Sequence, residues 1–140
     1  MGFASPKGGA NNSKDRTLTV SVKSRQTEVV DVGRKGPSQG DMRVVNAPLY
    51  DESGTQKVGR LDLNCVATDP ANKPNEKANM AECAYTYTLQ NGEISAQGVS
   101  ALPRALDAIT GGTSKYAGVQ GEVSVRTRGN TAVATFHFID

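Results

Sequence analysis

The chain has 140 residues, the size of one globular domain. Its 16 Lys and Arg residues nearly balance 14 Asp and Glu residues. The basic residues are scattered along the chain, which argues against nucleic-acid binding, and no apolar stretch reaches the roughly 20 residues of a membrane-spanning helix. With 15 Gly, 36% apolar residues and no Trp, the composition favours strands and tight turns around a modest core or a cavity.

The first sixteen residues are polar and rich in small side chains. We expect residues 1–16 to form a flexible tail and residues 17–140 to form a single domain. No apolar segment follows Met1, so this start does not read as a signal peptide. A tail of this kind often follows a removed signal sequence, which favours an exported protein and leaves a cytoplasmic one open.

Alternation of apolar and polar residues predicts extended structure along most of the chain. The expected segments are residues 17–22, 27–32, 41–50, 57–68, 80–90, 93–100, 105–110, 121–128 and 131–140. Asn91-Gly92 and Gly129-Asn130 predict tight hairpins, and residues 69–79 predict a long exposed loop. About eight antiparallel strands close as a barrel or pack as a sandwich. An eight-stranded barrel has an interior that side chains fill or that holds one small ligand.

Strand parity shows which side chains share one face of a strand, and one face of each strand must line the interior. We expect inward positions at Val44 with Asn46, at Leu61, Leu63 and Cys65, at Tyr85 with Tyr87, and at Val123 with Val125. Glu28 and Asp31 lie on opposite faces by parity, so at most one of them can point inward. A carboxyl group in an apolar interior has a raised pKa, which suits acid–base chemistry.

The chain has two cysteines, Cys65 and Cys83, on neighbouring predicted strands. They form either a cross-strand disulfide or two buried thiols, and we favour the disulfide. Two Cys and one His at these spacings match no zinc pattern, so we expect no metal site. His137 is the single histidine, and no nucleophile elbow accompanies it.

Several segments, taken in order, carry a family resemblance. They are Asn46-Ala47-Pro48-Leu49-Tyr50, Val58-Gly59-Arg60, residues 92–98 (GEISAQG) and, most specifically, residues 108–121 (AITGGTSKYAGVQG). Together they resemble the allene oxide cyclase and dirigent protein superfamily. The layout is also similar to bacterial barrel cyclases that close spirotetronate rings by a [4+2] reaction. The resemblance implies an all-β, eight-stranded antiparallel closed barrel with a lipocalin-like apolar lumen.

The resemblance also implies site residues and partners. Asn46 matches a pocket Asn that holds a water, Cys65 matches a pocket Cys, Tyr85 matches a wall aromatic, and Glu28 stands where a pocket Glu is expected. Members use no metal or organic cofactor, and they assemble as dimers or trimers, so a homodimer or homotrimer is expected. Dirigent proteins carry paired Asp residues where this chain has Asn46-Ala47, so their radical-guiding chemistry is not expected here.

These observations lead to one functional expectation and its rival. The leading hypothesis is a cofactor-free cyclase or isomerase that binds an apolar, unsaturated substrate in the lumen and directs stereocontrolled ring closure, of the natural-product or oxylipin type. Catalysis would come mainly from orientation, with Asn46 and Glu28 stabilising developing charge. The alternative is a non-catalytic barrel of the dirigent type that binds a small hydrophobic ligand.

Overall fold

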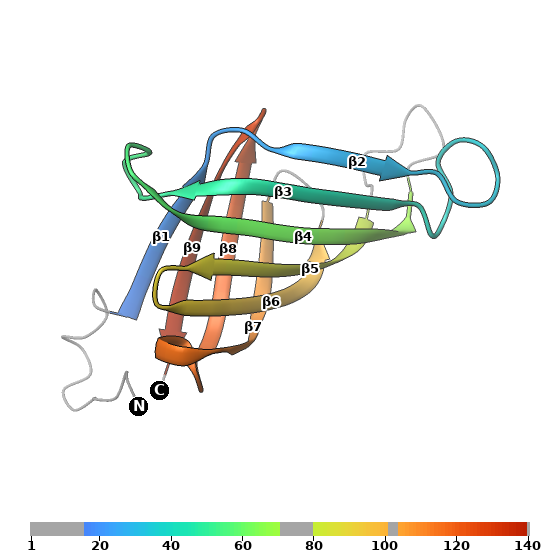
Figure 1. The fold of residues 1–140 in the computed structure, drawn as a ribbon. Helices are drawn as coiled ribbons and strands as arrows, with labels where there is room; N and C mark the ends of the chain where they lie inside the picture. Colours follow the sequence, from blue (N-terminus) through green and yellow to red (C-terminus); the bar gives the residue numbers. More distant parts are fainter. Residues whose placement is uncertain (1–15, 71–79, 101–103, 140) are drawn as a thin grey trace.

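The chain folds into a closed, all-β, antiparallel barrel (Figure 1). The structure is a computed structural model that describes residues 16–70, 80–100 and 104–139. The predicted N-terminal tail and most of the predicted 69–79 loop lie outside the described residues. Among the described residues, no helix is long and apolar enough to cross a membrane.

Nine strands form the sheet. They are β1 (Thr17–Val22), β2 (Gln26–Val30), β3 (Met42–Tyr50), β4 (Lys57–Asp69), β5 (Met80–Leu89), β6 (Gly92–Ser100), β7 (Arg104–Gly112), β8 (Gln120–Arg128) and β9 (Thr131–Ile139). Their spatial order is β1-β9-β8-β7-β6-β5-β4-β3-β2. A pairing of Ser21 in β1 with Tyr50 in β3 closes the ring. The barrel wall therefore contains eight strands, as the sequence predicts.

The ninth strand, β2, continues β1 after a bend. β1 pairs with β9 along its whole length, from Thr17↔His137 to Val22↔Ala132. Beyond the bend, β2 pairs with β3 alone among the described strands, with Gln26 opposite Asn46. Figure 1 shows β2 running along β3 toward one end of the barrel. The wall therefore lacks a strand pairing between β2 and the β8–β9 hairpin, and this end forms the mouth of the barrel.

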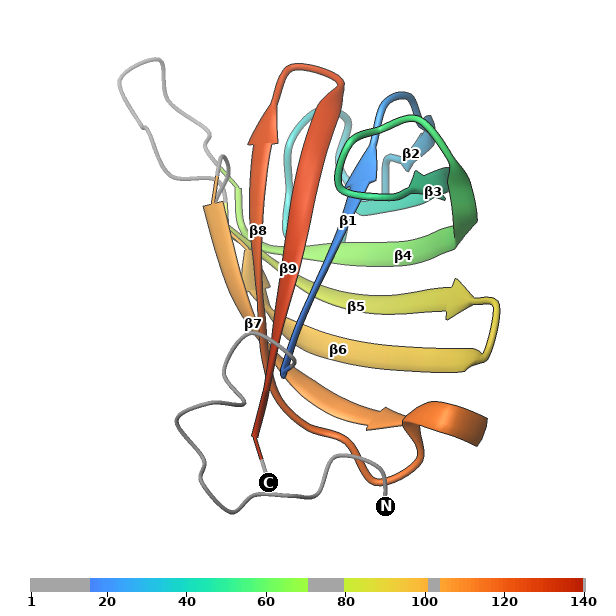
Figure 2. The ribbon, with the colours of Figure 1, turned by 90° about the vertical axis from the view of Figure 1, so that its left-hand side faces the viewer.

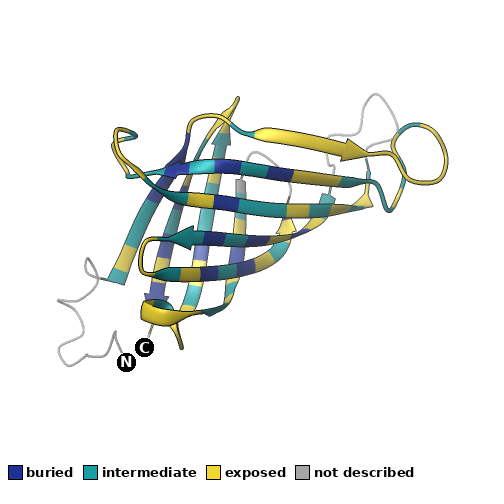
Figure 3. Cartoon of the chain, in the orientation of Figure 1, coloured by how far each residue is buried: buried dark blue, intermediate teal, exposed yellow. Residues whose placement is uncertain are grey.

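The opposite end is closed by side chains. Tyr87, Phe136, Ile94, Leu49 and Val20 are each at most 2% exposed and belong to one core cluster. The Tyr87 and Phe136 rings meet edge to face with centroids 4.7 Å apart, a favoured aromatic geometry. The burial colouring of Figure 3 alternates along most strands, as expected where one face of a sheet lines an interior.

The hairpins agree closely with the turn residues of the sequence. Gly129 has a φ of 62° and forms the β8–β9 turn with Asn130, as predicted. The β5–β6 turn uses Gln90 and Asn91, one residue earlier than predicted, because Leu89 pairs with Gly92. β7 is longer than the predicted 105–110 segment, because Gly111 and Gly112 pair with β6. A short 3-10 turn, η3 (Ser114–Tyr116), then leads toward β8 at the closed end, as Figure 2 shows.

Cys65 and Cys83 form a disulfide, the alternative that the sequence favours. The two residues are directly opposed on β4 and β5, with their Cα atoms 4.0 Å apart. The bond lies toward the mouth end, because β4 ends and β5 begins there. It links the two strands covalently near their mouth-side ends.

Candidate functional site

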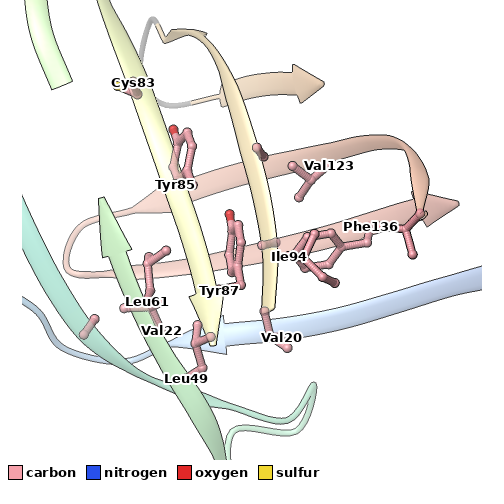
Figure 4. Packing of buried hydrophobic residues seen from close by; sticks show 14 of the residues in the cluster. Val20, Val22, Leu49, Leu61, Cys83, Tyr85, Tyr87, Ile94, Val123 and Phe136 are labelled. Carbon is pink, nitrogen blue, oxygen red and sulfur yellow. The ribbon is translucent and has the colours of Figure 1, made fainter. Parts of the chain in front are cut away.

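The mouth half of the barrel encloses a cavity of about 960 Å³. That volume lies in the range of small-molecule sites, about 300–1,000 Å³. The deeper walls are mostly apolar, and Figure 4 shows Leu61, Tyr85 and Tyr87 projecting into the interior from β4 and β5. Side chains that line these walls include Val20, Val22, Val45, Ala47, Leu49, Leu61, Leu63, Val125, Ala132 and Ala134. The interior is therefore filled at one end and hollow at the other.

A buried carboxyl group lies inside the barrel wall, next to the cavity-lining Tyr85. Asp107, on β7, is 1% exposed. Neither of its carboxylate oxygens has a hydrogen-bond partner among the described residues. Burial raises the pKa of Asp107 to about 6, and the nearby Tyr85 hydroxyl opposes that rise. A buried carboxyl group without donors is costly to ionise, so part of the Asp107 population carries a proton near neutral pH.

Tyr85 stands between Asp107 and the cavity. Its side chain lines the cavity, and its hydroxyl is close enough to Asp107 to influence that residue's pKa, although the carboxylate oxygens make no hydrogen bond among the described residues. Burial, and then the charge of Asp107, raise the pKa of Tyr85 to about 12, while the Ser100 hydroxyl acts in the opposite direction. Tyr85 therefore stays protonated and offers an O–H donor to a group in the cavity.

Gly98 makes room for Asp107. It lies on β6 opposite Cys83, and a Cβ atom at this position would collide with Asp107 Oδ1. Asp107 itself is opposite Val123 on β8, which is fully buried. The carboxyl group is thus held between a glycine backbone on one side and an apolar side chain on the other. This packing explains its strong burial.

Six of the predicted inward residues line the cavity. Leu61, Leu63 and Cys65 do so from β4, Tyr85 and Tyr87 from β5, and Val125 from β8. Val123 is buried in the core cluster but does not line the cavity. Burial also raises the pKa of the Tyr87 phenol above its usual value.

Two predicted residues on β3 have the wrong orientation. Val44 is 45% exposed, and neither it nor Asn46 lines the cavity; Val45, Ala47 and Leu49 do so instead. The segment has apolar residues at both parities, Val44 and Val45, so alternation alone did not fix the inward face. Asn46 is half-buried on the outer side, opposite Asp62 of β4. Its predicted role in the lumen has no support from this position.

Glu28 also faces outward. It is exposed and lies opposite Val44 on the outer face, whereas Thr27 and Val29 line the cavity. Of the two acidic residues left open by the sequence, Asp31 is the one that lines the mouth. One Asp31 carboxylate oxygen accepts a hydrogen bond from the Gly36 backbone amide at 3.0 Å. Asp31 therefore holds the β2–β3 loop at the mouth of the cavity.

Asp107 was missed by sequence reasoning. Residues 105–110 were predicted as a short extended segment without an assigned inward face, although Ala105, Asp107 and Ile109 recur with the strand period. A single carboxyl group at an inward position of that pattern was the signal. Among the described residues, no three His, Cys, Asp or Glu side chains gather as metal ligands would.

Comparison with known proteins gives matches among solved structures. Neither protein-family models nor curated proteins matched the chain. A structure named as pyocyanin demethylase is 28% identical, with 88% of this chain and 99% of that chain covered and a TM-score of 0.76. AbnU, an exo-specific intermolecular Diels-Alderase, is 18% identical over 87% of this chain and 97% of its own, with a TM-score of 0.62. The pterocarpan synthase dirigent protein GePTS1 is 12% identical over 99% and 96%, with a TM-score of 0.57. The fold is thus one that cyclases, a demethylase and a dirigent protein share.

Proposed function

We propose that this barrel is an enzyme that binds an apolar, unsaturated small molecule in its lumen and directs stereocontrolled ring closure or isomerisation. The observation that carries the proposal is the buried Asp107 carboxyl group, which has no hydrogen-bond partner among the described residues and lies beside a cavity of about 960 Å³. A barrel that only packed its core would have neither feature. The expectation that no cofactor takes part rests on the family resemblance alone.

The cavity supplies orientation. Its apolar walls would hold a flexible substrate in one folded conformation, and holding reacting groups together can supply several kcal/mol of the barrier. The Diels-Alderase that shares the fold is named for this kind of ring closure. We propose that the same physical principle operates here.

Tyr85 and Asp107 supply polarisation. In the substrate complex, a carbonyl oxygen of the substrate accepts a hydrogen bond from the Tyr85 hydroxyl. Neutral Asp107, which lies next to Tyr85, then donates its own hydrogen bond to the Tyr85 oxygen and so strengthens this donor. Fixed donors in a water-poor site stabilise developing negative charge better than water does. Removing one such donor costs about 10²–10³ in rate, so Tyr85→Phe should lower the rate by about that factor and leave substrate affinity nearly unchanged.

The titration of Asp107 gives the pH dependence. Because the neutral carboxyl group supports Tyr85, the rate should fall as the pH rises through about 6. Asp107→Asn keeps a hydrogen-bond donor and removes the titration, so its pH profile should be flat, whereas Asp107→Leu should lose most of the activity. A rate that rises through the same pH range would assign Asp107 as a base and contradict this role.

A second candidate is removal of a methyl group from an aromatic ring system. It is favoured by one observation, the 28% identity over nearly the whole length of the pyocyanin demethylase. Incubating the protein with pyocyanin, with and without an electron acceptor, and following loss of the methyl group by mass spectrometry tests it. Conversion that Tyr85→Phe abolishes would favour demethylation over cyclisation.

Blocking the cavity tests whether the lumen is the site. Ala105 lines the cavity near the start of β7, and Ala108 lies exposed on the same strand. Ala105→Trp should abolish binding of a neutral fluorescent probe, N-phenyl-1-naphthylamine, while Ala108→Trp should leave its affinity unchanged. Equal binding by both variants would remove the lumen from the proposal.

Turnover separates the enzyme from a ligand-binding barrel. The test substrates are a linear molecule with a conjugated diene and an alkene acceptor, and a fatty-acid epoxide. An enzyme changes the product ratio and stereochemistry relative to the uncatalysed reaction, and Ala105→Trp removes the change. Binding without any change in products would support the non-catalytic alternative.

A further inference from the structure

Arg43 stands at the rim of the cavity. It lies two residues before the buried Val45 on the inward side of β3, opposite Val29 of β2 and Cys65 of β4. Its side chain lines the cavity but remains exposed to solvent. Across the part of the chain that the structure describes, the Arg43 guanidinium makes neither a hydrogen bond nor an ion pair.

The other charged groups of the mouth are engaged. Arg25 donates to the Gly129 carbonyl at 3.2 Å and so connects the β1–β2 bend to the β8–β9 turn. Asp31 accepts from the Gly36 amide. Asp41 accepts from the Val32 and Ser38 amides at 2.8 and 3.0 Å, which together with the Ser38 hydroxyl hold the pKa of its carboxyl group below the usual value.

A line of neighbouring residues on the inner face of the wall runs from Arg43 on β3 to the buried Asp107 on β7. Arg43 is opposite Cys65, Cys65 is bonded to Cys83, Cys83 is opposite Gly98, and Gly98 packs against Asp107. Strands of a barrel tilt by about 35–45° from its axis, so such a line changes depth as it passes around the wall. Accordingly, Arg43 is exposed at the rim and Asp107 is 1% exposed within.

We infer that the ligand is amphipathic: an anionic oxygen group, such as a carboxylate or an enolate, binds the Arg43 guanidinium at the rim, and an apolar body extends past the disulfide toward Tyr85. This inference rests on the proposed function, because it specifies the substrate class of the same lumen. A guanidinium presents paired N–H donors that match two oxygens of such a group. Anchoring one end in this way fixes which part of the ligand reaches Tyr85.

Matched probe pairs test the inference. 1-Anilinonaphthalene-8-sulfonate is anionic, and N-phenyl-1-naphthylamine is its neutral counterpart with the same rigid aromatic body. cis-Parinaric acid and its methyl ester form a second pair with a flexible polyene body. Dissociation constants are measured by fluorescence titration for the wild-type protein, Arg43→Gln, Arg43→Lys and a control, Arg126→Gln. Arg126 is exposed on β8 and does not line the cavity.

We expect Arg43→Gln to weaken the anionic member of at least one pair by about three- to tenfold. The neutral members should change less than twofold, Arg43→Lys should retain part of the affinity, and Arg126→Gln should have no effect. The probe pair whose anionic member loses affinity shows whether the cavity prefers a rigid aromatic or a flexible polyene ligand. Equal affinities of wild type and Arg43→Gln for both anions would overturn the inference, as would an equal loss for charged and neutral probes. If neither neutral probe bound the wild-type protein, the proposed lumen site itself would fail.

Discussion

The two ends of the barrel are built on different principles. At the closed end, Tyr87, Phe136 and Ile94 fill the interior, and each is at most 1% exposed. At the mouth end, the same alternation of strands lines an empty space, and a disulfide joins β4 and β5. The comparison teaches that one continuous sheet can build a packed core at one end of a barrel and a cavity at the other. Substitutions at the two ends should therefore have different consequences.

The largest expected effect is at the closed end. Phe136 is fully buried and contacts the rings of Tyr87 and Phe138. Phe136→Ala should lower the free energy of unfolding by about 3–5 kcal/mol, the usual cost of removing a buried aromatic ring. The matched change at the open end, Val125→Ala, removes a side chain that borders a cavity already present, and should cost about 1 kcal/mol or less. Urea unfolding followed by circular dichroism measures both. Equal losses would mean that the cavity side is packed as tightly as the closed end.

The next effect concerns the disulfide, which joins positions 18 residues apart. Replacing both Cys65 and Cys83 by Ser should lower the free energy of unfolding by about 3 kcal/mol, because the unfolded chain regains the freedom of a closed loop of that length. The open end should lose order first, which hydrogen exchange of β4 and β5 amides can report. Unchanged stability of the double variant, relative to the oxidised wild type, would show that packing alone holds these strands.

The smallest of the three effects is a dependence on pH. Because the pKa of Asp107 is about 6 in the folded protein and 3.8 in the unfolded chain, the folded protein binds the extra proton between these values. The contribution of Asp107 to the free energy of unfolding is therefore fully present below about pH 4. It is lost as the pH rises through about 6, and the loss amounts to about 2–3 kcal/mol. Asp107→Asn should flatten this dependence. The measurement is the free energy of unfolding against pH for the wild-type protein and for Asp107→Asn. Equal slopes for the two proteins would mean that folding does not raise the pKa of Asp107.

Strand count and turn residues left a barrel and a sandwich open, and the family resemblance favoured the barrel. One wall of the cavity was predicted from local alternation. Residues 57–68 and 80–90 alternate over a long stretch, so the inward positions of Leu61, Leu63, Tyr85 and Tyr87 followed from parity. On β3 the adjacent Val44 and Val45 made parity ambiguous, and Asn46 was placed inward with Val44, the face that the resemblance also implied. The structure reverses that face.

Other features of the site depend on contacts that no local pattern contains. The burial of Asp107 requires Gly98 of β6 and Val123 of β8 on either side, and these residues are brought together only by the closed sheet. The open mouth likewise depends on where a strand pairing ends. β1 pairs with β9 only as far as Val22, and beyond that point β9 has no partner on this side among the described strands. Exposed Glu28 follows from the same bend, because β2 lies at the rim, where its outer face meets solvent.

The central claim is that the cavity and Asp107 form one site. The most direct measurement is the titration of the Asp107 side-chain carboxyl carbon by NMR, with and without saturating N-phenyl-1-naphthylamine, using Asp107→Asn to assign the resonance. We predict a pKa of about 6 for the free protein and a higher pKa with the probe bound, because an apolar ligand removes water from beside Tyr85. A pKa near the ordinary 3.8 that does not respond to the probe would contradict the account.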